Sequence, residues 1–136
     1  MNIDSIENGY VIDHIPVGKG MQIYNILSLD KLSCQVAIIT NAKSKKNDVK
    51  DIIKINELVD LDLDVIAYIA PNATVNVIKN SERIDKKNLS LPKEIKNVVK
   101  CPNPRCISNN EDIDHIFKLT DEKGTYRCLY CETMAL

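Results

Sequence analysis

Four of the five cysteines of this 136-residue chain lie within its last 36 positions. They form two close pairs, "CPNPRC" at residues 101–106 and "CLYC" at residues 128–131, with 21 residues between the pairs. Two close pairs joined by a loop allow four thiolates to converge tetrahedrally on one ion, as in zinc ribbons. Because sulfur would take all four positions, none is open for water or substrate. The spacing therefore predicts a structural Zn²⁺ site, one per chain, with the ligands Cys101, Cys106, Cys128 and Cys131.

Two disulfides or ordinary buried thiols are the alternatives to a metal site. The N-terminal segment "MNIDSIENGY" has neither the cationic start nor the apolar core of a secretory signal. No apolar run approaches the roughly 18 residues that a membrane span needs. We therefore expect a cytoplasmic protein with no membrane partner. Because the cytoplasm keeps thiols reduced, that location favours metal over disulfides.

Cys34 and His115 are of residue types that can bind a metal or act in catalysis, but we expect neither role for them. Cys34 stands alone in the sequence. A lone cysteine is more often a small buried hydrophobe than a nucleophile, so we expect it in the core. His115 lies between the two cysteine pairs. Because four sulfur ligands already satisfy the ion, we expect His115 to be an ordinary surface or strand residue.

Charge and composition argue against a nucleic-acid partner. The chain carries 18 basic and 19 acidic side chains, whereas nucleic-acid binders gain most of their affinity from a basic face. Aromatic residues make up 4% of the chain and Trp is absent, so platforms for stacking bases are few. A stand-alone zinc-ribbon module that binds nucleic acid is therefore the less favoured interpretation of the cysteines.

The chain divides near "NLSLPKEIKNVVKCPN", residues 88–103, where Pro92 ends the preceding segment. We expect an N-terminal domain over residues 1–95 and a metal domain over residues 96–136. The short apolar segment "EIKNVV" would bridge them. The second part is too small to bury a sufficient core without a staple, which the metal would supply.

Hydrophobic periodicity predicts the elements of the N-terminal domain. Strand patterns cover 9–16, 35–42 and 50–57, and a hairpin of 72–80 with 81–87 closes the domain. Helical spacing covers 18–30. With a second helix at 59–71, the order is βαββαβ plus one added strand. The chain is thus predicted to be α+β: a ferredoxin-like domain, with two helices on one face of an antiparallel sheet, followed by a small β zinc-ribbon-like domain.

The second helix, "VDLDLDVIAYIAP", is the ambiguous element. Between Val59 and Val65 apolar residues alternate with Asp, which by period alone is a strand pattern. However, Val65, Ile66 and Ile69 share one helical face. Asp residues also gather at the start, where the helix dipole favours them. We therefore predict a helix.

Asp13 and His14, in "VIDHIP", are adjacent in a predicted strand, so their side chains should face opposite sides of the sheet. An Asp–His pair suggests catalysis. No Ser, Cys or second carboxylate lies nearby in the sequence to complete such a site, however. An incidental pair of polar strand residues is the plainer alternative.

Lysines on neighbouring predicted strands form a candidate anion site. Lys50 and Lys54 are four residues apart and hence on one sheet face, and Lys86 and Lys87 close the last strand. Lysines that converge from several strands could hold a polyphosphate, but solvated lysines at strand ends explain the pattern equally well. The sequence contains no P-loop and no dinucleotide glycine fingerprint.

Five motifs follow one another along the chain: "GYVIDHIP", "KDIIKIN", "APNATVNVI", "LSLP" and "NVVKCPNPRCIS…CLYC". Their order and spacing closely resemble the regulatory chain of aspartate carbamoyltransferase, over nearly the whole length. The resemblance implies a non-catalytic subunit in de novo pyrimidine biosynthesis. Its N-terminal domain would bind nucleotide effectors (CTP, ATP and also UTP) and form a homodimer with its twin. Its zinc domain would dock on the catalytic chain, which alone performs the chemistry and would be modulated allosterically.

The resemblance also implies roles for individual residues. Lys86 would contact the effector's phosphates, and Asp13 and Lys54 its sugar or base. The contact with the catalytic chain would include Asn103, Glu132 and Arg105, the last in place of an expected Asn. Matched one by one, the effector pocket would contain Ile3, Ser5, Ile6, Val11, Asp13, His14, Lys54, Asn76, Ile78 and Lys86.

Three further positions depart from the family pattern, besides Arg105. Ser81 and Arg83 stand where the effector pocket would have an aromatic and then an aliphatic residue, which bears on effector preference. Thr133, two residues after the last cysteine, stands where a Lys is expected.

Overall fold

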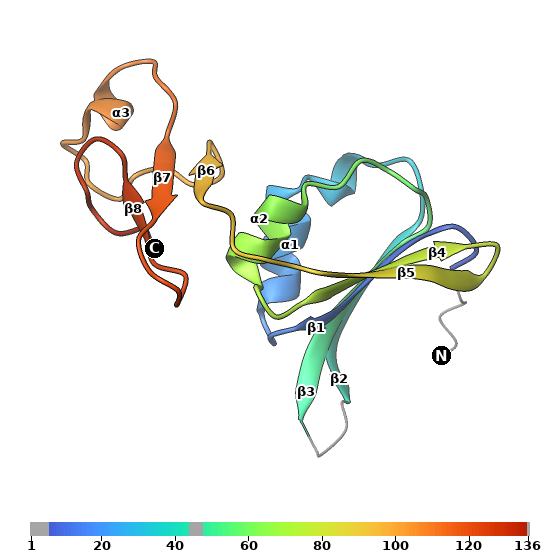
Figure 1. Ribbon diagram of the computed structural model, residues 1–136. Helices are drawn as coiled ribbons and strands as arrows, with labels where there is room; N and C mark the ends of the chain where they lie inside the picture. The colour runs from blue at the N-terminus through green and yellow to red at the C-terminus, as the bar shows by residue number, and fades with distance from the viewer. Residues whose placement is uncertain (1–5, 44–47, 136) are drawn as a thin grey trace. The chain divides into compact units, whose positions relative to one another are not determined.

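The computed structural model describes residues 6–43 and 48–135, and Figure 1 shows the course of the chain. The chain forms two compact units, residues 1–90 and residues 91–136. The first unit thus ends five residues before the predicted boundary at residue 95. The reason is that strand β6 (Glu94–Lys96) pairs with a strand of the second unit.

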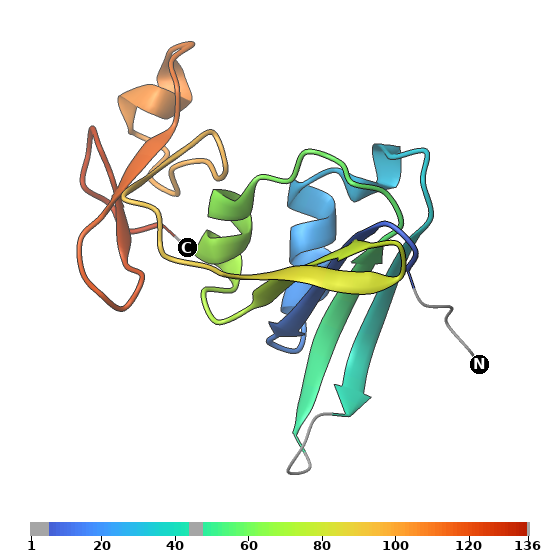
Figure 2. The same ribbon diagram turned by 45° about the vertical axis from the view of Figure 1, so that its right-hand side comes forward.

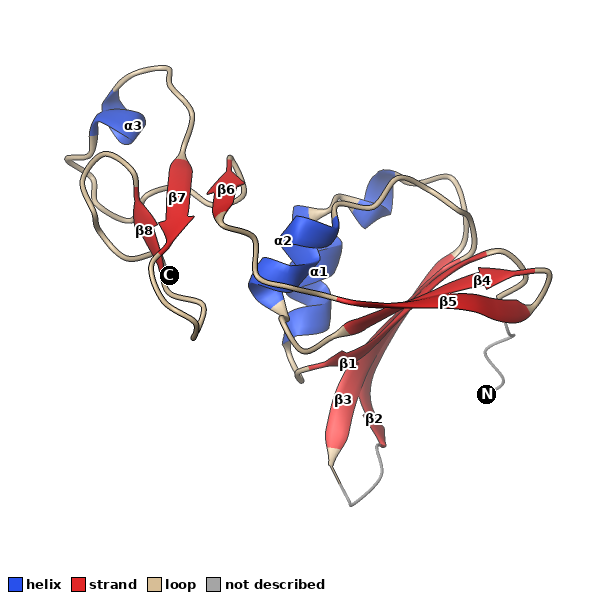
Figure 3. Ribbon diagram, in the orientation of Figure 1, coloured by secondary structure: helices blue, strands red, loops and turns tan. Residues whose placement is uncertain are grey.

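The first unit is a five-stranded antiparallel sheet in the order β2-β3-β1-β4-β5. Figures 1 and 2 show both helices on the same face of this sheet, and Figure 3 separates helices from strands by colour. The order along the chain is βαββαβ plus one strand, so the predicted ferredoxin-like plan is confirmed. The elements are β1 (Gly9–Ile15), α1 (Lys19–Ile26), a 3-10 turn (Leu29–Lys31), β2 (Val36–Lys43), β3 (Val49–Ile55), α2 (Leu63–Ile69), β4 (Thr74–Lys79) and β5 (Glu82–Asn88).

The core of the first unit lies between the sheet and its two helices. Apolar residues of the three central strands point into it, and the helices contribute one apolar stripe each. All of these side chains are at most 7% exposed: Ile12, Ile15, Ile53, Ile55 and Val75 from the strands, and Ile23, Val65, Ile66 and Ile69 from the helices. Among the described residues of this unit, no helix lies on the opposite face of the sheet, which we call the helix-free face.

Helix α2 is formed by the segment whose pattern also fitted a strand. Asp62 is its N-cap, and the carboxylate accepts hydrogen bonds from the backbone N–H groups of Asp64 and Val65. Such a cap satisfies donors that have no partner within the helix. The alternating residues before Leu63 remain outside the helix. The predicted helix is therefore confirmed, with a later start than residue 59.

Cys34 does not lie in the core. It precedes β2, and its side chain is half-buried. The prediction of a core cysteine is wrong, because the apolar residues of β2 begin only at Val36.

The second unit is a three-stranded antiparallel sheet in the order β6-β7-β8, with a short helix α3 (Ile107–Asn110). Strand β7 covers Ile116–Leu119 and β8 covers Tyr126–Cys128. The segment predicted as an apolar bridge begins with β6, where Ile95 pairs with Phe117. That bridge prediction is wrong, since half of "EIKNVV" belongs to the small sheet. Among the described residues, no helix is long and apolar enough to cross a membrane.

Candidate metal centre and effector site

The four paired cysteines converge at one point of the second unit. Their Sγ atoms all lie within 4.8 Å of one another. The Sγ–Sγ distance is 3.5 Å between Cys101 and Cys131, and 3.6 Å between Cys106 and Cys128. Four sulfurs placed tetrahedrally around Zn²⁺ at about 2.3 Å would be about 3.8 Å apart. The donor set therefore fits a closed four-thiolate metal site.

Short-range hydrogen bonds shape the first cysteine pair. The carbonyl of Asn103 accepts from the N–H of Cys106 at 3.0 Å, and its side-chain oxygen accepts from the N–H of Arg105 at 3.0 Å. The side chain of Asn109 donates to the carbonyls of Cys101 and Asn103, at 2.8 and 2.7 Å. These bonds fold residues 101–106 into a compact turn that brings two thiols together.

The second pair is built in the same way by backbone bonds. The N–H of Glu132 donates to the carbonyl of Cys128 at 3.0 Å, and Glu132 has a positive φ of 64°. The N–H of Cys128 in turn donates to the carbonyl of Thr133 at 2.9 Å. Both Glu132 and Arg105, predicted to contact the catalytic chain, are exposed, whereas Asn103 is half-buried.

Hydroxyl groups lie against two of the sulfurs. The Ser108 Oγ is 3.1 Å from the Cys106 Sγ, and the Thr133 Oγ1 is 3.2 Å from the Cys131 Sγ. Once the sulfurs are thiolates, each hydroxyl can donate to its neighbour and offset part of the net −2 charge of a four-thiolate Zn²⁺ site. Sequence reasoning missed both contacts, and treated Thr133 only as a departure from the family pattern.

The local environment affects the four thiols differently. Burial raises the pKa of Cys101 to about 12 and also raises the pKa of Cys128. Hydrogen bonds from the side chain and the backbone of Thr133 lower the pKa of Cys131 to about 6. A coordinated cation deprotonates its thiol ligands outright, which removes the cost of ionising the buried ones. Cys101 and Cys128, whose pKa values burial raises, therefore gain most from a metal.

In the first unit, strand register aligns four of the predicted effector residues. Val11 of β1 is paired with Lys54 of β3 on one side and with Asn76 of β4 on the other. Asn76 is paired in turn with Lys86 of β5. Directly paired residues point to the same face of an antiparallel sheet. Because the next residue, Ile12, points into the core, this row lies on the helix-free face.

Asp13 and His14 extend the same face, because β1 contains a bulge there. The register between β1 and β3 shifts between Ile12 and Ile15, both fully buried, and His14 has a positive φ of 59°. An extra residue in a strand interrupts the alternation of side chains. The prediction that Asp13 and His14 face opposite sides of the sheet is therefore wrong.

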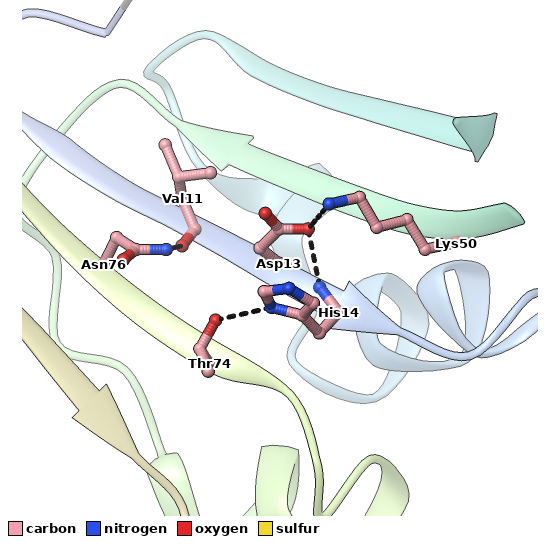
Figure 4. Close-up of polar contacts among 6 residues, drawn as sticks. All are labelled: Val11, Asp13, His14, Lys50, Thr74 and Asn76. Atoms are coloured by element: carbon pink, nitrogen blue, oxygen red, sulfur yellow. Dashed lines mark hydrogen bonds and ion pairs between the residues drawn. The ribbon is translucent and has the colours of Figure 1, made fainter. Parts of the chain in front are cut away.

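Both side chains are held by partners on neighbouring strands, as Figure 4 shows. The Asp13 carboxylate is 2.8 Å from the Lys50 Nζ and accepts a 2.6 Å bond from the N–H of His14. The His14 Nδ1 is 3.1 Å from the Thr74 hydroxyl. Burial opposes ionisation of Asp13, but the hydrogen bonds from Lys50 and His14 outweigh it and lower the pKa of the carboxyl.

Of the remaining effector candidates, the structure describes Ile78 and Ile6. Ile78 lies two residues after Asn76 and is half-buried, and Ile6 is 7% exposed. Ile3 and Ser5 lie outside the described residues. Lys87 is paired with the buried Val75, so it belongs to the opposite face from Lys86.

Comparison with protein families matches both units. Residues 1–90 match the family model of the aspartate carbamoyltransferase regulatory chain, allosteric domain. Residues 93–135 match that of the aspartate carbamoyltransferase regulatory chain, metal binding domain. The chain belongs to this family. The four clustered cysteines lie within the matched metal binding domain, which supports a bound metal there, and the row on the helix-free face lies within the matched allosteric domain.

Individual regulatory chains of aspartate carbamoyltransferase are similar over nearly the full length. The one from Clostridium acetobutylicum is 51% identical over an alignment of 134 positions, which covers 97% of this chain and 92% of that protein. The one from Bifidobacterium longum is 41% identical over an alignment of 137 positions, which covers 99% of each chain. Family membership makes this chain a non-catalytic subunit that interacts with a catalytic chain.

Proposed function

We propose that this chain binds nucleoside triphosphates on the helix-free face of its N-terminal sheet and thereby regulates aspartate carbamoyltransferase in de novo pyrimidine biosynthesis. The observation that carries the proposal is the row of Lys54, Asn76 and Lys86 across that face. Lys54 and Lys86 are three strand spacings apart, or about 14 Å. An extended nucleoside triphosphate spans a comparable distance from its base to its terminal phosphate.

The charges of this face fit a nucleotide anion. Lys50 is neutralised by Asp13, whereas no ion pair among the described residues involves Lys54 or Lys86. Lys86 is therefore available for phosphate, with Lys54 at the sugar or base. The polar groups of Asn76 and His14 lie between them. Binding needs no nucleophile, and we expect CTP, ATP and UTP to be bound without hydrolysis.

Calorimetry with two neighbouring lysines tests the site. Lys86→Ala should weaken binding of CTP or ATP by about 1–3 kcal/mol, the size of a charge-assisted hydrogen bond. Lys87→Ala is the matched control, because it removes the same charge from the same strand on the opposite face. Equal losses for the two variants would show a general charge effect, and unchanged binding by Lys86→Ala would exclude this residue from the site.

The metal we propose is Zn²⁺, one per chain. Four thiolates in a tetrahedral arrangement with no open position are typical of structural zinc sites. Thiols kept for a metal also suit the reducing cytoplasm, which is where we expect the protein. Metal analysis of the purified chain tests the assignment, and a Zn²⁺ content well below one per chain contradicts it.

We further propose that the N-terminal unit forms the homodimer through the edge strand β2. The two edge strands of this sheet differ in character: β5 reads "ERIDKKN" and is exposed throughout, whereas β2 begins with "VAII". A half-exposed apolar edge strand favours pairing with another chain, and charges on an edge oppose it. Ile39→Lys, on the helix-free face of β2, should therefore shift the chain towards monomer in sedimentation, and Ile84→Lys on β5 should not.

Docking on the catalytic chain would use the metal-binding unit. Large apolar side chains that stay exposed around the cysteine pairs support this role: Ile107, Leu129, Tyr130 and Met134. Aromatic anchors such as Tyr130 commonly dominate interface energies. Tyr130→Ser should reduce co-purification with the catalytic trimer while the metal content is unchanged. A filter-binding assay with single-stranded DNA or RNA should show no binding, which separates this function from a nucleic-acid module.

A further inference from the structure

His115 contacts the metal centre without being one of its ligands. It directly precedes strand β7 and is half-buried, and its Nδ1 accepts a hydrogen bond from the backbone N–H of Cys101 at 3.3 Å. The ring therefore lies against the first cysteine of the site, although the two residues are 14 positions apart in sequence. For Nδ1 to accept, the neutral imidazole must carry its proton on Nε2.

Asn97 fixes the position of His115. Its backbone N–H donates to the His115 carbonyl at 2.7 Å, and its side-chain oxygen accepts from the His115 N–H at 2.9 Å. The Asn97 side-chain nitrogen donates to Asp114 at 2.9 Å, and Asp114 also pairs with Lys96 at 3.3 Å. Lys96, the last residue of β6, and Asn97, the residue after it, thus hold the two residues that precede β7. His115 has little freedom to move away from Cys101.

Cys101 is consequently held from both sides of its backbone. His115 accepts from its N–H, and Asn109 donates to its carbonyl at 2.8 Å. The position of a thiolate depends on its backbone, since only one carbon separates the sulfur from Cα. Groups behind metal ligands set ligand orientation, and their loss typically costs about 10–100-fold in metal affinity.

We propose that His115 is a positioning residue of the metal centre, which holds Cys101 in place and slows release of the ion, and that Asn97 acts through it. The proposal rests on the four-cysteine site alone, so it stands or falls separately from nucleotide binding. It gives a role to a histidine that is not needed as a ligand.

Metal release from the intact chain tests the proposal. The chain is loaded with Zn²⁺ or with Co²⁺, whose thiolate absorption reports the site directly, and excess chelator is added. His115→Leu should release either ion about 10–100-fold faster than the parent. His115→Asn should stay close to the parent, because its side-chain oxygen can occupy the place of Nδ1. His115→Gln should resemble His115→Leu, because its oxygen extends to the place of Nε2.

Two further variants separate positioning from general destabilisation. Lys118→Ala changes an exposed residue of the adjacent strand β7 and should leave release unchanged. Asn97→Gly removes the side chain but tolerates the positive φ of 58° at this position. It should accelerate release, and adding it to His115→Leu should accelerate release by much less than the product of the two factors.

Hydrogen exchange at the Cys101 amide gives a second readout. It should be faster in His115→Leu than in His115→Asn with the metal bound in both. Equal metal release by His115→Asn and His115→Gln overturns the proposal, even if His115→Leu fails to fold. Parent-like release and parent-like exchange at Cys101 in a folded His115→Leu would overturn it as well.

Discussion

Replacement of Asp51 by Ala should destabilise the N-terminal unit more than any surface change. Asp51 lies on β3 and is fully buried, with its side chain on the helix side of the sheet. Its Oδ2 accepts from the N–H groups of Gly18 and Gly20, at 3.0 and 3.1 Å. Its Oδ1 accepts from the N–H of Asn41 at 3.3 Å. One carboxylate thus joins the β1–α1 turn, the first turn of α1 and strand β2.

The magnitude follows from the three donors. The N–H of Gly20 is buried, and a buried donor that loses its partner costs about 1–3 kcal/mol. Gly18 and Asn41 are exposed residues, so water can replace part of what their N–H groups lose. All three bonds are made to a charged group, which makes each one stronger. We therefore expect Asp51→Ala to lower the free energy of unfolding by about 3–5 kcal/mol.

Asp51→Asn should lower the free energy of unfolding by less, about 1–3 kcal/mol. Its side-chain oxygen can still accept from the N–H groups of Gly18 and Gly20, but its NH₂ group would face the N–H of Asn41, and two donors cannot bond to each other. Asp48→Ala, which removes an exposed carboxylate three residues away, is the matched control and should stay within about 0.5 kcal/mol. The assay is urea unfolding of the metal-loaded chain, followed by hydrogen exchange in β3. A cost for Asp51→Ala equal to that of Asp48→Ala would refute the reasoning.

Three other outcomes are expected. Chelation of the metal should expose residues 91–136 to hydrogen exchange while the N-terminal sheet remains protected, since only the small unit depends on the ion. Protection of the small unit after chelation would contradict this. The Asp13 pair should stabilise the fold above pH 3.8, the ordinary carboxyl value, and this contribution should be lost as the pH falls towards its lowered pKa. Asp13→Asn should therefore flatten the dependence of the urea midpoint on pH in that range. An unchanged dependence would show that the Asp13 pair does not contribute to stability. Mixed with catalytic trimers, the chain should make the aspartate response depend on nucleotide by about 1–3 kcal/mol, and a substrate analogue should shift nucleotide affinity equally. A stable complex without such reciprocal shifts would leave the chain as a scaffold only.

The sequence predicted those features whose signal is local. The two cysteine pairs carry their ligand spacing within a few residues, and period-two and helical patterns marked each strand and helix of the first unit. The choice of a helix at α2 succeeded because Asp62 caps it, in agreement with the Asp-rich start. By contrast, the effector residues came from the family resemblance, since pattern alone gave solvated lysines equal weight.

The features that pattern missed depend on partners far along the chain. The bulge at Asp13 and His14 leaves no mark in a continuous strand pattern, because it depends on register with β3. Asn97 holds His115 although the two residues are 18 positions apart in the sequence. The sequence of β6 does not predict a strand, because three residues are too few to show a period-two pattern. Its pairing with β7 cannot be seen in the local sequence.

The dipeptide of Lys50 and Asp51 connects the two faces of the N-terminal sheet. Lys50 points to the helix-free face and pairs with Asp13 on the bulged strand, whereas Asp51 points inward and holds the turn before α1. The register pairs Asp51 with Ile15, directly after the bulge, and a second irregularity in β2 lies on the other side of β3. The shape of the proposed effector face thus depends on a buried carboxylate that no nucleotide would touch. Variants of Lys50 should therefore change nucleotide affinity and lose only the contribution of the Asp13 pair to stability, whereas variants of Asp51 should change nucleotide affinity together with a larger loss of stability.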